Sequence, residues 1–233
     1  MLILAFETSA KPVSVAVYET GNKLLGQYFQ NNGFSHSRTL MSMAESLLSN
    51  LGLKPADLGV IAVANGPGSF TGVRIGVSAA KGLAYGLDIP VCGISTLEAM
   101  ASQTKQPDAI ICPVMDARRN QVYNALFEWK DNSFIRLCND RAISIEDLLV
   151  ELNNFDKPCL PVGDGSDLLT AKIQDVIKFK SLNLITPCSL MKYQTAYGVA
   201  LAALKHKSVP AAELEPLYLR PSQAEREAGS RSL

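Results

Sequence analysis

The chain of 233 residues is long enough to form one large globular domain or two small ones with a sizeable buried core. Hydrophobic residues make up 47% and charged residues 19%, proportions typical of a globular protein. The 22 Lys and Arg balance the 22 Asp and Glu and form no long run, which argues against a free-standing nucleic-acid binder with a basic face. A role beside RNA, with a partner supplying the positive charge, stays open.

Targeting and redox features favour a cytoplasmic location. The apolar opening, residues 1–6, has no basic segment before it and is followed by Glu7, so it predicts a strand and not a signal peptide. No apolar run is long enough to span a membrane. The cysteines are odd in number and form no C-x-x-C pair, so we expect buried free thiols, and neither disulfides nor metal ligands, at Cys92, Cys112, Cys138, Cys159 and Cys188.

The first half predicts a mixed sheet of five strands between helices. A meander of three strands comes first, at residues 2–6, 13–18 and 24–29, and the alternation in the second of these predicts a half-buried antiparallel strand. Helices and strands then alternate, with a helix over 35–51, a strand over 59–64, a helix over 73–87 and a strand over 89–94.

A glycine-rich turn, residues 65–72, joins the strand at 59–64 to the helix that follows it. Exposed amides at such a helix start form an anion site, and glycines let a ligand approach the backbone. The turn lacks the Gly-Lys-Ser/Thr of a P-loop and the G-x-G-x-x-G of a dinucleotide site. A tight strand-to-helix connection is the simpler interpretation.

The second half repeats the opening of the first. A strand at 110–115 ends in Asp116 and leads through a short turn to an alternating strand at 121–129, as the first strand ends in Glu7 before its own turn. We interpret this as duplication, looser in the second copy, which adds a helix from Ser144, a strand at 159–162, a turn at 163–166 and a final helix at 190–207. We expect domains at 1–105 and 106–233, with the final helix packed back on the first domain.

Two duplicated α/β domains with an acid at each first hairpin resemble the actin-like ATPase (ribonuclease H-like) superfamily, which includes sugar kinases and chaperone ATPases. The resemblance implies a cleft where the hairpin turns grip phosphates. Neither turn here contains glycine, Pro12 removes a donor amide, and Arg118 and Arg119 add bulk, so the cleft is expected to be degenerate. Its candidate binding residues are Glu7, Thr8, Ser9, Asp116, Gly163 and Gly165.

The charged residues of the two turns allow two interpretations each. Glu7 and Asp116 are general bases by type, but stabilising their turns is the simpler role. Arg118 and Arg119 either steer a phosphate of tRNA or of a nucleotide, or are solvated turn charges.

Four segments resemble the TsaB (YeaZ) family: residues 5–9, 65–76, 90–97 and 218–225, of which the second is the most specific. The resemblance runs from residue 1 to about 228, and no meaning is assigned to residues 229–233. It implies an accessory, non-catalytic subunit that binds and activates the catalytic paralogue TsaD and works with the P-loop ATPase TsaE. The complex places threonylcarbamoyl on N6 of the adenosine beside the tRNA anticodon. We therefore expect no cofactor required by this chain, weak or junction-bound ADP or ATP, and contact with tRNA through the complex.

The resemblance implies that the catalytic paralogue carries a metal-binding His-x-x-x-His after the strand that corresponds to residues 89–94. Superimposing the glycine-hydrophobic step of the two strands places those histidines at Thr96 and Met100 here. Neither side chain replaces an imidazole as a ligand, and the two histidines of this chain, His36 and His206, lie in different halves. The sequence thus predicts no metal site and disfavours a metallopeptidase. An independent ATPase or small-molecule kinase of the actin-like fold remains the alternative.

The two helices of the first domain are the candidate partner surface. The helix at 73–87 is apolar nearly all round, which predicts burial on two sides, either under the second domain or against a partner. The family resemblance implies pairing through these helices, with a second copy or with TsaD. The predicted interface comprises Met41, Met43, Leu48, Arg74, Ile75, Gly76, Ala79, Ala80 and Leu83.

Overall fold

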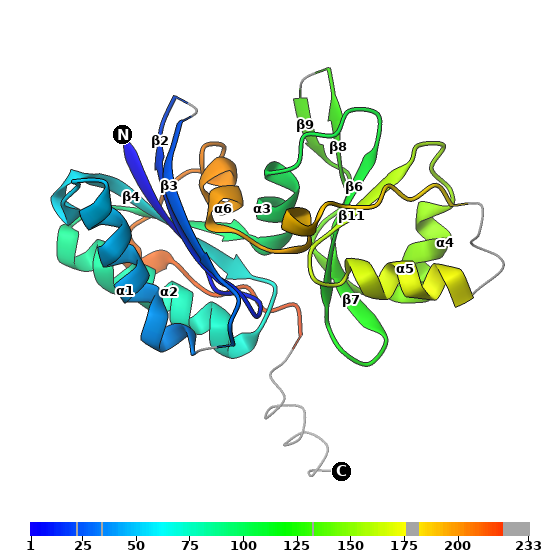
Figure 1. Ribbon diagram of the computed structural model, residues 1–233, viewed down its shortest axis with the longest axis horizontal. Coiled ribbons are helices and arrows are strands. Elements are labelled where there is room, and N and C mark those ends of the chain that lie inside the picture. The colour runs from blue at the N-terminus through cyan, green and yellow to red at the C-terminus, as the bar shows by residue number, and fades with distance from the viewer. Residues whose placement is uncertain (22, 34, 132, 176–181, 221–233) are drawn as a thin grey trace, which may run out of the picture.

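The computed structural model describes residues 1–21, 23–33, 35–131, 133–175 and 182–220. Figure 1 shows two α/β halves side by side, with the N-terminus in the left half. The end of the motif that begins at Tyr218, residues 221–225, and the tail at 229–233 lie outside the described residues. Within the described part of the chain, no helix is long and apolar enough to cross a bilayer.

The first half contains the predicted mixed sheet of five strands, in the order β3-β2-β1-β4-β5. The first three strands form the antiparallel meander, and β4 and β5 add in parallel to β1. The strands are β1 (Leu2–Glu7), β2 (Val13–Glu19), β3 (Lys23–Gln30), β4 (Leu58–Gly66) and β5 (Val91–Ser95).

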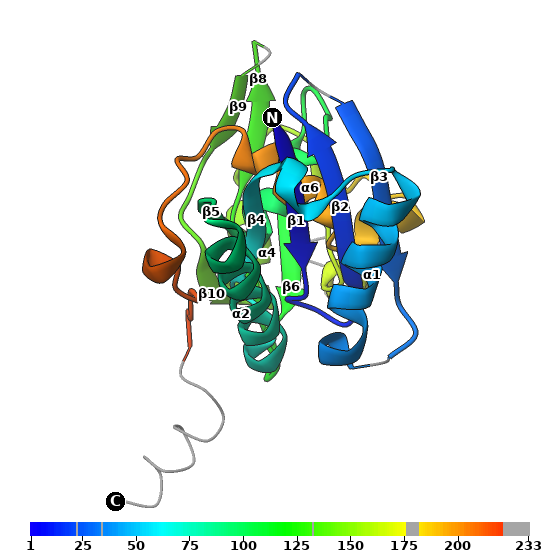
Figure 2. The same cartoon turned by 90° about the vertical axis from the view of Figure 1, so that its left-hand side faces the viewer.

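Helices cover both faces of this sheet. On one face lie α1 (His36–Asn50) and α2 (Phe70–Leu87), and on the other lies α6 (Ala196–Ala203), which returns from the far end of the chain (Figure 2). The strand β2, expected to be half-buried, is therefore buried on both faces. The predicted final helix at 190–207 is shorter than expected, because a 3₁₀ turn (Ser189–Lys192) precedes α6.

The second half is built around β6 (Ile110–Asp116), which pairs with three other strands. The predicted strand at 121–129 is two strands, because the buried Asn124 side chain donates to the carbonyls of Pro113 (2.9 Å) and Ala125 (3.0 Å) at the break. The sheet thus has six strands: β6, β7 (Gln121–Asn124), β8 (Phe127–Lys130), β9 (Ser133–Arg136), β10 (Arg141–Ser144) and β11 (Cys159–Val162). Its helices are α4 (Ile145–Leu152) and α5 (Ser166–Asp175).

A short buried helix, α3 (Thr96–Ser102), joins the two halves. Its Ala99 packs into the core under α6, whereas Leu97 and Met100 pack against β6 and β11 of the second sheet. Both sheets therefore pack against the same helix, and the segments that follow β1 and β6 line a common cleft.

Candidate functional site

A cleft of about 770 Å³ lies where the hairpin turns of the two halves approach the start of α2. Its walls come from segments that are far apart in the sequence, and Gly33, His36 and Tyr123 line it beside the main ones. The main segments are Ser9–Lys11 after β1, Pro67–Thr71 at the start of α2, Met115–Arg118 after β6, Asp164, and the C-terminal segment Leu217–Arg220.

The glycines at the start of α2 admit protein backbone. A Cβ atom on Gly68 or Gly72 would overlap the carbonyl oxygens of Ser9 and Thr8, respectively. The contact is fixed by hydrogen bonds from the Ser69 amide to the Ser9 carbonyl (2.6 Å) and from the Thr8 hydroxyl to the Gly72 carbonyl (2.7 Å). The glycine-rich turn is thus a tight connection that lets the first hairpin pack on α2.

Glu7 is almost completely buried at the end of β1. One carboxylate oxygen accepts a hydrogen bond from the Ser9 amide at 2.6 Å, and the other has no partner among the described residues. Burial raises the pKa of Glu7 to about 7, the hydrogen bonds of Ser9 lower it, and the nearby charge of Asp164 raises it. Asp164, whose pKa is also raised by burial, accepts a hydrogen bond from Gln194 at 3.0 Å.

Asp116 occupies the matching position in the second half, where it is exposed. Its Oδ1 accepts a hydrogen bond from the Arg118 amide at 2.7 Å, so both candidate acids hold their turns in this structure. Arg118, Arg119 and Asn120 all have positive φ angles, between 55° and 63°, and all three side chains are exposed. Of the two arginines in this turn, Arg118 lines the cleft, whereas Arg119 is exposed and is not among the lining residues.

The remaining candidate cleft residues have packing roles. Thr8 and Ser9 are fully buried, and the Ser9 hydroxyl has no partner among the described residues. Gly163, with φ of 100°, and Gly165 lie against Val114 at the end of β6, where a Cβ atom would clash. The structure therefore brings Ser9, Asp116 and Asp164 to the cleft wall, with Glu7 behind them.

The positions expected for metal ligands are occupied by core side chains. Thr96 and Met100 lie one turn apart on α3 and are 0% and 1% exposed. In the described part of the chain, no three His, Cys, Asp or Glu side chains gather as a metal site would require. His36 begins α1 and lies 3.1 Å from the Lys11 carbonyl, and His206 lies 2.9 Å from Glu98.

The cysteines are free thiols, as expected. Cys92, Cys112 and Cys159 are buried and Cys138 is half-buried, whereas Cys188 is exposed, contrary to the expectation of burial. The difference arises because Cys188 lies in an irregular segment just before the 3₁₀ turn and not in a strand.

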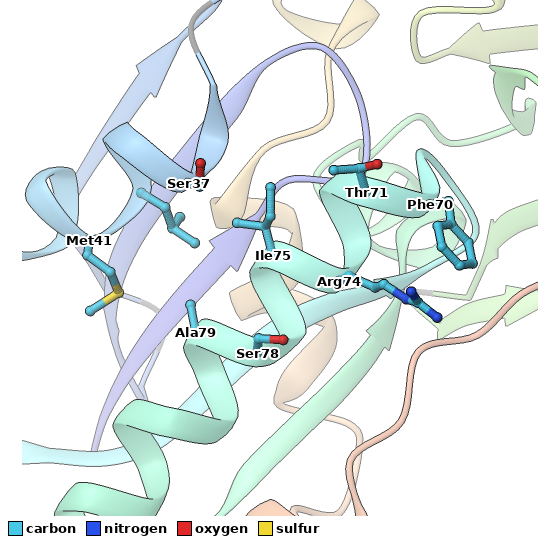
Figure 3. Close-up of a pocket in the computed structure, with 9 residues that line it drawn as sticks. Ser37, Met41, Phe70, Thr71, Arg74, Ile75, Ser78 and Ala79 are labelled. Carbon is cyan, nitrogen blue, oxygen red and sulfur yellow. The ribbon is translucent and has the colours of Figure 1, made fainter. Parts of the chain in front are cut away.

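A second hollow, of about 510 Å³, lies between α1 and α2 on the outer face of the molecule (Figure 3). Met41 is 43% exposed there, Ile75 and Ala79 are half-buried, and the second domain does not cover them. We call this the α1–α2 groove. Its lining is mostly apolar or small: Ser37, Leu40, Met41, Phe70, Thr71, Arg74, Ile75, Ser78 and Ala79.

Three residues of the predicted partner interface are buried in the chain's own core. Leu48 is 6% exposed, Ala80 is 0% exposed, and Gly76 sits against the Thr8 side chain. The prediction was wrong for these residues because α2 is apolar on two sides, and the spacing alone does not show which side meets the sheet. Met43 and Leu83 are half-buried and pack against the same core.

Arg74 connects the α1–α2 groove to the cleft. Its guanidinium lies 4.0 Å above the Phe70 ring, and its Nε donates to the Tyr218 hydroxyl at 3.0 Å. Phe70 and Tyr218 stack with ring centres 4.7 Å apart, and Arg220 reaches the Ala117 carbonyl of the second domain at 2.8 Å. Sequence analysis missed this arrangement, because nothing in the pattern of the C-terminal segment shows where it packs.

A family model, curated relatives and a solved structure all relate this chain to proteins of tRNA threonylcarbamoyladenosine biosynthesis or to YeaZ. The family model described as TsaD, tRNA N6-adenosine threonylcarbamoyltransferase, matches residues 32–226. The chain is 38% identical to the tRNA threonylcarbamoyladenosine biosynthesis protein TsaB of Bacillus subtilis, over 77% of this chain and 78% of the relative. It is 30% identical to TsaB of Haemophilus influenzae over 94% of both chains. The solved structure of YeaZ from Pseudomonas aeruginosa, at 23% identity, superposes with a TM-score of 0.76 over 94% of this chain and 99% of that one, which supports the duplicated actin-like fold.

Proposed function

The chain belongs to the TsaB family of tRNA threonylcarbamoyladenosine biosynthesis proteins, and we propose that it acts there as a non-catalytic subunit that binds and activates a TsaD-type paralogue. The reaction would place threonylcarbamoyl on N6 of the adenosine beside the anticodon, with catalysis on the paralogue. The match to the family model of the transferase supports a common ancestry of the two proteins. The work would take place in the cytoplasm, where tRNA is processed.

The α1–α2 groove is the observation that carries this proposal. It presents Met41, Ile75 and Ala79 on two long helices that the second domain leaves uncovered. Methionine adapts to the shape of a partner, and small residues let another helix approach closely. A partner that covers this face would bury on the order of 1,600 Å² in total, as a typical stable interface does. We propose the TsaD-type paralogue as that partner.

The non-catalytic role is supported by what occupies α3. Thr96 and Met100, at the positions where the paralogue is expected to hold its metal, are sealed inside the contact between the two domains. Water and substrate do not reach them without separation of the two halves. This burial also disfavours a metallopeptidase.

We propose that this chain by itself needs no cofactor in the cleft. A phosphate of ADP or ATP would be held weakly, or only once the paralogue closes the junction. The start of α2, Lys11 and Arg118 favour an anion there, whereas Asp116 and Asp164 oppose it. An independent ATPase is the second candidate, and measurable ATP turnover by the isolated chain would favour it.

We further propose that a second copy of this chain uses the same groove, so that homodimer and heterodimer compete. A TsaE-type P-loop ATPase would bind the assembled pair, and tRNA would be bound by the complex.

The proposal is tested by introducing charge into the groove. Met41→Arg and Ser78→Arg each place a cation on an exposed position of the lining, and each should weaken association with the paralogue at least tenfold in calorimetric titration. Val150→Arg on α4 is the matched control, because Val150 is also a helical residue that is 43% exposed. Equal affinities of all three variants and the wild type would refute the groove as the docking site.

A further inference from the structure

A group of lysines lies at the edge of the molecule where the chain leaves α6 and meets the β8–β9 hairpin, at the top of Figure 1. The Lys205 ammonium lies 4.1 Å from the centre of the Phe134 ring and 5.4 Å from that of Trp129. On the same indole, Lys105 lies 5.6 Å from the ring centre. We call these four residues the lysine–aromatic patch.

The carboxylates beside this patch are already paired with other cations. Glu98 binds Arg136 at 3.0 Å and His206 at 2.9 Å, and Glu128 binds Lys157 at 2.8 Å. Within the described part of the chain, no carboxylate lies within ion-pair distance of Lys105 or Lys205, both of which are exposed. Two ammonium groups thus lie on the same indole without a direct ion pair to an acid, although the charge of Glu98 acts on Lys205.

Further exposed lysines lie close to the patch residues along the chain. Lys207 and Lys130 are exposed on the neighbouring segments, whereas Asp131 at the hairpin turn and Asp108 are the exposed acids nearest along the chain. The local balance is positive although the whole chain is neutral. Such a surface attracts anionic groups locally, although the net charge of the whole chain does not.

The aromatic rings hold the lysines in place. The Trp129 indole donates to the Thr104 carbonyl at 2.8 Å, and Phe134 stacks on the buried Phe127 with ring centres 5.1 Å apart. Partial burial lowers the pKa of Lys205, an effect that an approaching anion would oppose. The ammonium groups are therefore presented from a rigid platform, which reduces the entropy lost on binding.

We propose that the lysine–aromatic patch binds phosphate groups of the tRNA, so that this chain contributes its own contact to the RNA. The inference rests on the proposed function, which brings tRNA to the complex. In Figure 2 the β8–β9 hairpin lies at the opposite end of the view from the start of α2, so the patch stays open when a partner covers the α1–α2 groove. Phosphates of the RNA backbone suit this patch, because the lysine ammonium binds a phosphate as a point charge and does not distinguish between bases.

The test removes the two charges and keeps the side-chain stems. Lys105→Gln/Lys205→Gln is compared with Lys23→Gln/Lys54→Gln, which changes net charge equally at two exposed lysines outside the patch. Unmodified tRNA is titrated onto the complex of each variant with the paralogue at several salt concentrations. We expect the patch variant to bind about tenfold more weakly, with a salt slope smaller by about 1.4 to 1.8, because two phosphate contacts are lost. The control should match the wild type.

Equal losses in both variants, or no loss in either, would overturn the proposal and leave the patch as packing between the domains. Gel filtration of each complex separates these outcomes from loss of assembly. Failure of the proposed function would give a different result. The rate of tRNA modification would then be the same with and without the wild-type chain, while the patch variant would still bind tRNA more weakly than the control variant. In steady-state kinetics the patch variant should raise KM for tRNA with little change in kcat, whereas a damaged fold would lower kcat as well.

Discussion

Glu7 and Asp116 make the same contact in the two halves of the chain: each carboxylate accepts a hydrogen bond from the amide two residues downstream, at 2.6 Å from Ser9 and 2.7 Å from Arg118. The duplicated unit has thus kept this hydrogen bond, although the backbone of the two turns differs: Arg118, Arg119 and Asn120 have positive φ angles and the residues after Glu7 do not. Glu7 is 1% exposed and Asp116 is solvent-exposed, and burial raises the pKa of Glu7 to about 7. The same hydrogen bond is therefore buried in the first half and exposed to solvent in the second.

Replacing Glu7 with Gln should change how stability depends on pH. The pKa of Glu7 is about 7 in the folded protein and near 4.5 in the unfolded chain, so the folded state binds the extra proton between these values. The wild-type free energy of unfolding should therefore fall as pH rises from about 4.5 to above 7, by at most about 3 kcal/mol. Glu7→Gln should remove this fall, and Asp116→Asn should not. Urea unfolding at pH 5, 7 and 8.5 measures the free energy of unfolding of each protein. The prediction is contradicted if this free energy varies with pH in the same way for Glu7→Gln and the wild type.

Two glycines of α2 should respond in opposite directions to alanine. Gly72→Ala drives a methyl group into the Thr8 carbonyl, which should destabilise the protein by about 1–3 kcal/mol. Gly82→Ala meets nothing within 4 Å at an exposed position of the same helix and should stabilise it by up to about 1 kcal/mol. The midpoint of thermal unfolding of each variant, compared with that of the wild type, tests this prediction. Similar effects of the two changes would mean that the hairpin does not pack on α2 as described.

The ion pair of Arg136 with Glu98 should contribute stability at neutral pH and lose it in acid. Burial raises the pKa of Glu98, but hydrogen bonds and charges of His206 and Arg136 outweigh it and lower the pKa overall. A lowered carboxyl pKa gives stability that is present above about 4.5 and lost as pH falls through the folded value. Arg136→Met should cost about 1–3 kcal/mol at pH 7 and less at pH 3.

Lys192→Met is the control for that variant. Its partner, the Asp167 side chain, is 75% exposed, so the change should cost less than about 1 kcal/mol at either pH. Chemical denaturation at the two pH values gives both comparisons. A cost for Arg136→Met that is independent of pH would show that its packing over the Phe127 ring, and not its charge, matters.

Local patterns in the sequence predict much of the first domain. The alternation in β2 predicted an antiparallel strand but not its burial on both faces. The apolar run of β4 and the stripe of Val73, Val77 and Ala84 on α2 point to the observed sheet and to the helix that covers it. The break in the strand after Asn124 could not be predicted, because it depends on two carbonyls that the fold brings to the amide of this side chain. Long-range contacts decide such details.

The candidate sites were predictable to different degrees. The two turn acids follow from their positions after apolar strands, whereas Asp164 and Arg220 reach the cleft from segments 48 and 104 residues beyond Asp116. The partner surface on α1 and α2 stays a prediction, and within it Gly76 and Ala80 face inward. Small residues fit equally well against the chain's own sheet and against a partner helix, so composition does not distinguish the two faces.

The most direct test of an accessory, non-catalytic role is a tRNA threonylcarbamoylation assay rebuilt from purified components, with and without this chain. The account predicts that modification by the TsaD-type paralogue needs this chain, and that the chain alone neither modifies tRNA nor hydrolyses ATP. Modification at an unchanged rate without it would contradict the account, and ATP turnover by the isolated chain would favour an independent ATPase instead.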